Sequence, residues 1–91
     1  MDIIKKGSVV ISTAGRDSGN PFLVTDCDDV YAYLCDGKIR PVEKPKKKKI
    51  KHLRFLSSDI SEKITVKLET GIKVENAEVR KALSKFLQEV L

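Results

Sequence analysis

Histidine, cysteine and tryptophan are scarce in this sequence, and their scarcity argues against most catalytic chemistry. The 91 residues contain one histidine, two cysteines and no tryptophan. The one histidine, His52, has no partners in an order typical of a catalytic triad, and no glycine loop ends in the lysine and hydroxyl pair of a P-loop. No helical segment carries a spaced pair of metal ligands. We therefore expect a protein that is not an enzyme and that needs no metal and no cofactor.

The two cysteines do not form a recognisable site. Cys27 and Cys35 are too widely spaced for a zinc knuckle or a CxxC redox pair. If the turn at residues 28–29 joins its flanking strands in simple register, Cys27 faces Val30 and Cys35 faces Phe22. The two thiols are then not opposite each other, and a disulfide requires that they are. We expect two reduced thiols.

Long apolar runs are also absent. A membrane-spanning helix needs about 20 apolar residues in succession, and the uncharged stretches here are far shorter. The N-terminal segment MDIIKKGSVV lacks the sustained apolar region of a signal peptide. We expect a cytoplasmic protein with no membrane partner. The length and a hydrophobic content of 41% suit one small domain, which we expect to be monomeric.

Positive charge is abundant, and it is concentrated in residues 38–54, which read KIRPVEKPKKKKIKHLR. This basic block holds nine Lys and Arg against the single acid Glu43 and carries +8, whereas the rest of the chain holds nine bases against twelve acids and carries −3. Clustered cations neutralise neighbouring phosphates and release their counterions, so they attract a polyanion better than scattered charges do. The basic block therefore predicts nucleic-acid binding, with RNA preferred.

Short apolar runs separated by turn signals cover residues 3–56, with a spacing typical of an all-β barrel or sandwich. The pair Asp36-Gly37 predicts a type I′ hairpin turn, because that turn needs positive φ at both central residues. Pro41 and Pro45 bracket the start of the lysine run and favour an edge strand or an extended linker. The expected strands are residues 8–12, 22–27, 30–34, 38–42 and 50–56.

Alternation along these strands assigns residues to faces. Tyr31 and Tyr33 lie between residues of the opposite face, so they are expected at the barrel surface or against a helix, with base stacking as the alternative. The residues expected to point inward are Val30, Ala32, Leu34, Leu53 and Phe55.

After residue 57 the pattern becomes helical. Asp59 with Glu62 resembles a capping pair, and Gly71 supplies a stop. The alternation of Ile64, Val66 and Leu68 also fits a strand. The helical face that we expect consists of Ile60, Ile64 and Leu68.

The final segment has the clearest helical pattern. Asn76 is the expected N-cap, and Glu78 complements the positive end of the helix. Its apolar stripe is expected to pack on the barrel, with a partner helix or a dimer seam as the alternative. The stripe consists of Val79, Ala82, Leu83, Phe86, Leu87 and Val90.

Three ordered motifs carry a resemblance to a known family. The segment KKGSVVISTAGRDSGNPFLVTDC resembles a KOW motif, a short β-hairpin segment of ribosomal and transcription-factor proteins with a glycine at a turn. The segments DGKIRPVEKPKKKKIKHL and ENAEVRKAL are similar to bacterial KOW-domain RNA-binding proteins related to the archaeal and eukaryotic large-subunit ribosomal protein fourteen-e. The resemblance implies an SH-three-like barrel over residues 1–56 and a helical extension over residues 57–91 of the same compact domain. It also implies binding of structured ribosomal RNA, in or near the large subunit.

The expected RNA contacts follow from residue type. Lysines are point charges suited to backbone phosphates, whereas arginines can grip a phosphate bidentately or stack on an unpaired base. Ser18 and Asn20 stand where the family usually has basic residues, so the basic block must supply most contacts. Asp17 is expected to cap the turn or to accept from a ribose hydroxyl. The expected RNA-binding residues are Gly15, Arg16, Gly19, Arg40, Lys44, Lys46, Lys47, Lys48, Lys49, Lys51, His52 and Arg54.

A protein-interaction module is the alternative class of function. Small barrels also bind peptides, and KOW domains can serve as docking sites in transcription and ribosome assembly. The partner, for example a ribosomal protein, would be acidic and would use the same basic block.

Overall fold

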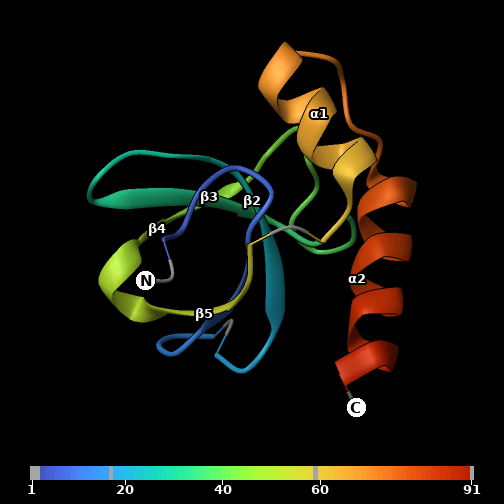
Figure 1. The fold of residues 1–91 in the computed structure, drawn as a ribbon. Helices are drawn as coiled ribbons and strands as arrows, with labels where there is room; N and C mark the ends of the chain where they lie inside the picture. The colour runs from blue at the N-terminus through green and yellow to red at the C-terminus, as the bar shows by residue number, and fades with distance from the viewer. Residues whose placement is uncertain (1–2, 17, 59, 91) are drawn as a thin grey trace.

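One antiparallel sheet of five strands is followed by two helices (Figure 1). The computed structural model describes residues 3–16, 18–58 and 60–90. Of residue 90, only the backbone is described. The expected order, strands first and helices after, is confirmed. The elements are β1 (Val9–Ser12), β2 (Pro21–Cys27), β3 (Tyr31–Cys35), β4 (Lys46–Lys49), the 3₁₀ helix η1 (Ile50–His52), β5 (Leu53–Ser57), α1 (Glu62–Thr70) and α2 (Asn76–Val90).

The sheet is strongly curled, because its two edge strands are neighbours in the chain. The strand order is β4-β3-β2-β1-β5, and only η1 connects β4 to β5. Four strand spacings in a flat sheet would set the two edges about 19 Å apart. The four residue steps across η1 reach at most about 14 Å. No ladder joins β4 to β5 in the part of the chain that the structure describes, so the sheet is rolled but not closed.

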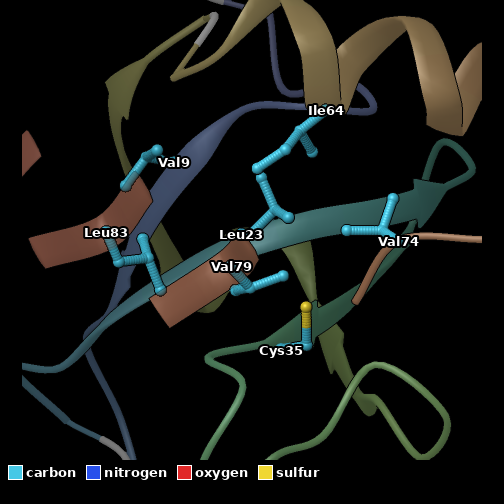
Figure 2. Packing of buried hydrophobic residues seen from close by; sticks show 7 residues of the cluster. All are labelled: Val9, Leu23, Cys35, Ile64, Val74, Val79 and Leu83. Carbon is cyan, nitrogen blue, oxygen red and sulfur yellow. The ribbon is translucent and has the colours of Figure 1, made fainter. Parts of the chain in front are cut away.

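Two apolar clusters form, one on each face of the sheet. The inner cluster, inside the curl, consists of Val10, Phe22, Val24, Ala32 and Leu34, with Ile4, Cys27, Ile50 and Leu53 packed against it. The outer cluster, between the sheet and the helices, consists of Val9, Leu23, Cys35, Ile64, Val74, Val79 and Leu83 (Figure 2). Because successive strand residues point to opposite faces, β1 and β2 need apolar residues at consecutive positions. This requirement explains the runs VV and FLV.

Helix α1 has well-defined ends. The Oγ atom of Ser61 accepts a hydrogen bond from the N–H of Ile64, and Gly71, at φ +76°, ends the helix by donating its N–H to the carbonyl of Lys67. The stop at Gly71 is confirmed, whereas the expected cap Asp59 lies outside the described residues. The expected helical face packs on the outer cluster, so the strand alternative is wrong. Ile64 and Leu68 of that face lie in α1, whereas Ile60 precedes the helix; all three contribute to the outer cluster.

Helix α2 is capped by Glu78, and the expected cap Asn76 is wrong. The Glu78 carboxylate accepts from the N–H of Glu75, the residue before the helix, over 2.9 Å. The Asn76 amide is used for a long-range contact instead: its oxygen accepts from the N–H of Val42 over 2.8 Å, and its nitrogen donates to Glu43. The apolar stripe packs on the sheet as expected, through Val79, Ala82, Leu83 and Phe86. In the described chain, neither helix is long and apolar enough to cross a bilayer.

The expected strand over residues 38–42 is wrong, and residues 36–45 form an irregular loop. A type I′ turn needs two residues at positive φ, but of this pair only Gly37 has one, at +79°. The Asp36 carboxylate instead accepts from the N–H groups of Lys38 and Arg40, which closes a compact turn. The Gly37 carbonyl accepts from the Arg80 guanidinium over 2.8 Å, so the loop docks on α2. The return strand is β4, the lysine run itself.

The turn between β2 and β3 is one residue longer than expected. The Asp28 carboxylate accepts from the N–H groups of Val30 and Tyr31, and β3 begins only at Tyr31. Val30 therefore lies in the turn with 52% of its surface exposed, which contradicts its expected inward position. A bulge between Val24 and Asp26 accommodates the shift.

The cysteines pair with apolar residues across this hairpin. Cys27 lies opposite Ala32, and Cys35 lies opposite Leu23, so the partners that simple register assigns are wrong. The two thiols are still not opposite each other, because each cysteine pairs with a different residue. Both cysteines are free, so the expectation that no disulfide joins them is confirmed.

The last strand begins later than expected. Residues 50–52 form η1, and β5 starts at Leu53. Leu53 packs against the inner cluster, and the register places Phe55 opposite Val10 on the same inner face. The expected inward direction of both side chains is confirmed.

Candidate nucleic-acid interface

The four lysines of β4 point to two sides of an edge strand. Directly opposed residues of an antiparallel pair share a face. Lys47 and Lys49 lie opposite Tyr33 and Tyr31 on the outer face of the sheet. Lys46 and Lys48 lie opposite the buried residues Leu34 and Ala32, so they lie on the inner side. The four lysines therefore do not form one continuous cationic face, because a strand alternates its side chains.

On the outer face, two tyrosines lie beside two lysines. The Lys47 ammonium lies 4.3 Å from the centre of the Tyr31 ring, which is a cation–π contact. Tyr33 is half-buried like Tyr31, whereas Lys47 and Lys49 are exposed. Neither tyrosine belongs to an apolar cluster. We name these four residues the β4 outer face.

Lys48 has a structural role that its sequence context does not indicate. Its ammonium donates a hydrogen bond to the carbonyl of Ala14, in the loop between β1 and β2. A Cβ atom placed on Gly15 would lie 3.5 Å from the same ammonium. The half-buried Lys48 side chain thus reaches from one edge of the curled sheet to the loop after β1.

The β1–β2 loop exposes its glycines and its arginine. Gly15 and Gly19 have φ values of +79° and +85°, and nothing lies within 4 Å of a Cβ placed on Gly19. The N–H of Gly19 donates to the Ser12 carbonyl over 2.8 Å, which closes the loop. Arg16 is exposed, and the expected role of Asp17 lies outside the described residues. The open space at Gly19 leaves the backbone accessible to a ligand.

The same loop lies beside η1 and the start of β5. The N–H and Oγ1 groups of Thr13 both donate to the carbonyl of His52, each over 2.9 Å. Arg54 pairs with Ile11 in the β1–β5 ladder, and like Lys51 it is exposed. The fold therefore brings residues about 35 positions apart to one end of the sheet. We name these residues the corner group: Arg16, Lys51, His52 and Arg54.

Arg40 and Lys44 lie in a different place, in the loop that docks on α2. The half-buried Arg40 donates its backbone N–H to Asp36, and the exposed Lys44 donates its N–H to the carbonyl of Pro41. This loop also holds the one acid of the basic block. The amide of Asn76 donates to Glu43, and this bond holds the pKa of Glu43 below its ordinary value. The negative charge of Glu43 is thus directed towards α2.

In the part of the chain that the structure describes, the exposed lysines of the basic block are not held by carboxylates. Among the residues that the structure describes, the ion pair is Lys67 with Glu78 on the two helices, at 2.7 Å, and it contains no residue of the block. Asp28 and Asp29 lie beside β4, at the β2–β3 turn. There, hydrogen bonds from the N–H groups of Tyr31 and Val30 lower the pKa of Asp28, and the positive charge of Lys47 adds to this. Negative charge therefore bounds the β4 outer face at one end.

A shallow apolar hollow of about 390 Å³ lies between the β4 outer face and the corner group. Val30 and Ile50 supply apolar walls, and Lys49 and Lys51 stand at its sides together with Asp29. The sequence reading missed this feature because Val30 was assigned to the core. The sequence carries no direct signal of it, because Lys49 and Lys51 lie about 20 positions away from Val30.

No protein-family model matches the sequence, and the comparison with curated proteins returns no match.

Proposed function

We propose that the protein binds RNA, without catalysis, through the β4 outer face and the corner group. One observation carries the proposal. Exposed cationic side chains from two segments far apart in the sequence, the β1–β2 loop and residues 47–54, lie around one end of the sheet, and no carboxylate among the described residues forms an ion pair with them. The residues are Arg16, Lys47, Lys49, Lys51 and Arg54.

Phosphate positions rather than base identity determine where such a surface binds. The flexible lysines neutralise backbone phosphates and carry little sequence preference. Arg16 and Arg54 can each grip one phosphate bidentately. Because bases inside an A-form helix are hard to reach, folded RNA is recognised mainly by shape and backbone. We expect broad RNA binding with weak dependence on sequence.

Unpaired bases can add a second contribution. Tyr31 and Tyr33 offer aromatic rings beside Lys47 and Lys49, which is the pairing of stacking surface and cation that single strands use. The hollow walled by Val30 offers a further apolar surface. Single-stranded segments of a folded RNA are therefore the preferred ligand.

We further propose that the curled sheet is a small barrel of the SH-three-like type and that the RNA is ribosomal. The first proposal is supported by the strand order and by the η1 connection between the two sheet edges. The second is supported by the resemblance of three sequence motifs to KOW-domain proteins. Binding to an isolated large ribosomal subunit, compared with the small subunit, tests the second proposal.

A salt titration tests the RNA proposal directly. If five cations each neutralise one phosphate, log affinity for an RNA hairpin with a single-stranded loop should fall against log salt with a slope of about −4. Fluorescence anisotropy between 50 and 300 mM salt, roughly the range in which such slopes are measured, provides the values. A slope near zero would contradict phosphate binding.

A pair of charge-matched variants tests the location. In the first, Lys47, Lys49, Lys51 and Arg54 are changed to Ala; in the control, Lys63, Lys73, Lys81 and Lys85 on or near the helices are changed to Ala. Both lose four positive charges, so any difference reports position. We expect the first variant to lose at least about tenfold more affinity than the control, since each phosphate contact is local. Equal losses would leave only net charge as the cause.

The protein-interaction alternative has its own outcome in these experiments. Poly-glutamate supplies negative charge without phosphates, sugars or bases. If it competes for the β4 outer face as well as RNA does, an acidic protein partner becomes the better assignment.

A further inference from the structure

A groove of about 540 Å³ lies between α1 and α2, outside the surface assigned to RNA. Its apolar floor includes Ile60, Ala82 and Phe86. All three are half-buried and pack against the outer cluster. Phe86 is thus an aromatic side chain that lines this groove and is partly exposed. Such a volume lies within the range of ordinary ligand sites.

Lysines form the rim of this groove. Lys63 on α1 and Lys81 and Lys85 on α2 all line it, and all three are exposed. Two carboxylates are also present. Glu78 is engaged by the Lys67 ammonium and by the N–H of Glu75, which leaves Glu89 as the acid that opposes the three rim lysines. The groove therefore combines an apolar floor with a net positive rim.

We propose that this groove binds an acidic, amphipathic helical segment of another protein. An apolar face would cover Phe86 and Ile60, and acidic residues on its two sides would meet Lys63 across α1 and the pair Lys81 and Lys85 along α2. A helix in a groove is a common recognition mode that uses this combination of anchors and flanking charges. The nine residues of α1 span about 13 Å, which corresponds to a contact of two to three helical turns.

The charge pattern favours a peptide over a nucleic acid. A phosphate chain repeats its charges at a fixed spacing and would have to pass Glu89, whereas a peptide can place its acids only beside the lysines. The helices lie on the other side of the molecule from β4 and η1 (Figure 1). This proposal consequently does not depend on RNA binding, and the two ligands could be bound at the same time.

The test uses the full chain and one defined probe. The probe is a 14-residue peptide, about the length that covers the groove, with leucines at helical i, i+4 spacing flanked by glutamates. Its control has lysine at every glutamate position. We expect the ¹⁵N-labelled protein to show shift changes at the amides of Ile60, Ala82 and Phe86 with the acidic peptide and none with the basic one.

A variant pair locates the binding. Changing Lys81 and Lys85 to Gln should weaken the acidic peptide about tenfold, because two partly screened charge pairs are lost. Changing Lys38 and Lys73, which are exposed and do not line the groove, to Gln removes the same charge elsewhere and should leave the affinity for the acidic peptide unchanged. Glutamine keeps the helix propensity of lysine, so the fold is retained.

Three results would overturn the proposal. The first is the absence of shift changes in the groove at millimolar acidic peptide. The second is a larger shift change at the groove amides with a 12-nucleotide poly-uridine strand than with the acidic peptide. The third is self-association in sedimentation that the groove variant abolishes, since the occupant would then be a second copy of this chain.

Discussion

The ammonium of Lys48 donates a hydrogen bond to the carbonyl of Ala14, and this contact joins the edge strand β4 to a loop 34 residues earlier. Because an ammonium is the donor, the bond should be worth more than a neutral one. We expect Lys48→Met, which keeps the aliphatic stem, to lower the free energy of unfolding by about 2 kcal/mol. Urea denaturation measures it.

Lys47→Met is the matched control for that change. Lys47 is exposed on the same strand and donates to no carbonyl in the described chain. Its removal should cost little, because an exposed cation–π contact is worth about 0.5–1 kcal/mol at most. A Lys48 variant that is as stable as the Lys47 variant would contradict the structural role.

Glycine at position 37 is required by space as well as by backbone angle. A Cβ atom there would lie 2.5 Å from the backbone oxygen of Asn76 and 2.9 Å from Arg80. Gly19 has a similar positive φ but faces open space. We expect Gly19→Ala to lower the free energy of unfolding by about 1 kcal/mol through strain alone. Gly37→Ala should cost about 3 kcal/mol, since the loop must leave α2. Equal losses in urea denaturation would show that the loop is not firmly docked.

If the proposed surface is correct, replacing Tyr31 should weaken the binding of single-stranded RNA more than the binding of duplex RNA. Base stacking on an aromatic ring contributes about 1–3 kcal/mol per base, so Tyr31→Ala should weaken a single-stranded oligonucleotide about tenfold. Duplex RNA offers no free base and should lose much less. Tyr31→Phe keeps the ring and serves as control. A loss for the Phe variant as large as for Ala would assign the effect to the hydroxyl and refute stacking.

Glu78 should make stability depend on acid pH. Hydrogen bonds from Glu75 and Lys67 hold the folded-state pKa of Glu78 below its ordinary value of 4.5. A carboxyl with a depressed folded pKa stabilises the fold at pH values above 4.5, and this contribution disappears as the pH falls through the folded pKa. Glu78→Gln should therefore lower Tm at neutral pH, and the difference from the parent protein should shrink in acid. A difference that is constant from neutral to acid pH would argue against this linkage.

The two cysteines should react at different rates. Burial raises the pKa of Cys35 to about 12, with smaller effects from Asp36 and Glu43. Burial and the nearby acids also raise the pKa of Cys27, but that side chain is partly exposed. Because the thiolate is the reactive form, iodoacetamide at pH about 8 should label Cys27 first and Cys35 only as the protein unfolds. Mass spectrometry of digested protein reads both sites. Equal labelling in the native state would contradict the burial of Cys35.

Much of the fold could be predicted from periodicity. Alternating or continuous apolar runs located β1, β2, β3 and β5 to within a few residues, and the stripe of α2 was identified because i, i+3, i+4 spacing is unambiguous over four turns. Strand β4 could not be found in this way. It has only lysines, and its strand conformation comes from pairing with β3, which is a tertiary effect.

The candidate site was predicted in composition but not in arrangement. A charge count identifies the basic block, yet it cannot say that alternate lysines of β4 turn to opposite sides or that Lys48 binds Ala14. The prediction of a type I′ turn at Asp36-Gly37 failed for a similar reason. Its geometry is decided by Arg80 and Asn76 of α2, which are about 40 residues away. The role of Asn76 was missed for the same reason, because its partner Val42 is distant in sequence.

The outer cluster has a consequence for any shortened form of this protein. Val9, Leu23 and Cys35 are buried in one cluster with Val79 and Leu83 of α2 and with Ile64 of α1. A fragment that stops after β5 would expose an apolar surface on the outer face of its sheet. We expect such a fragment to aggregate or to bind other proteins non-specifically. Helices α1 and α2 thus cover the outer cluster. We expect the sheet and the two helices to unfold as one cooperative unit.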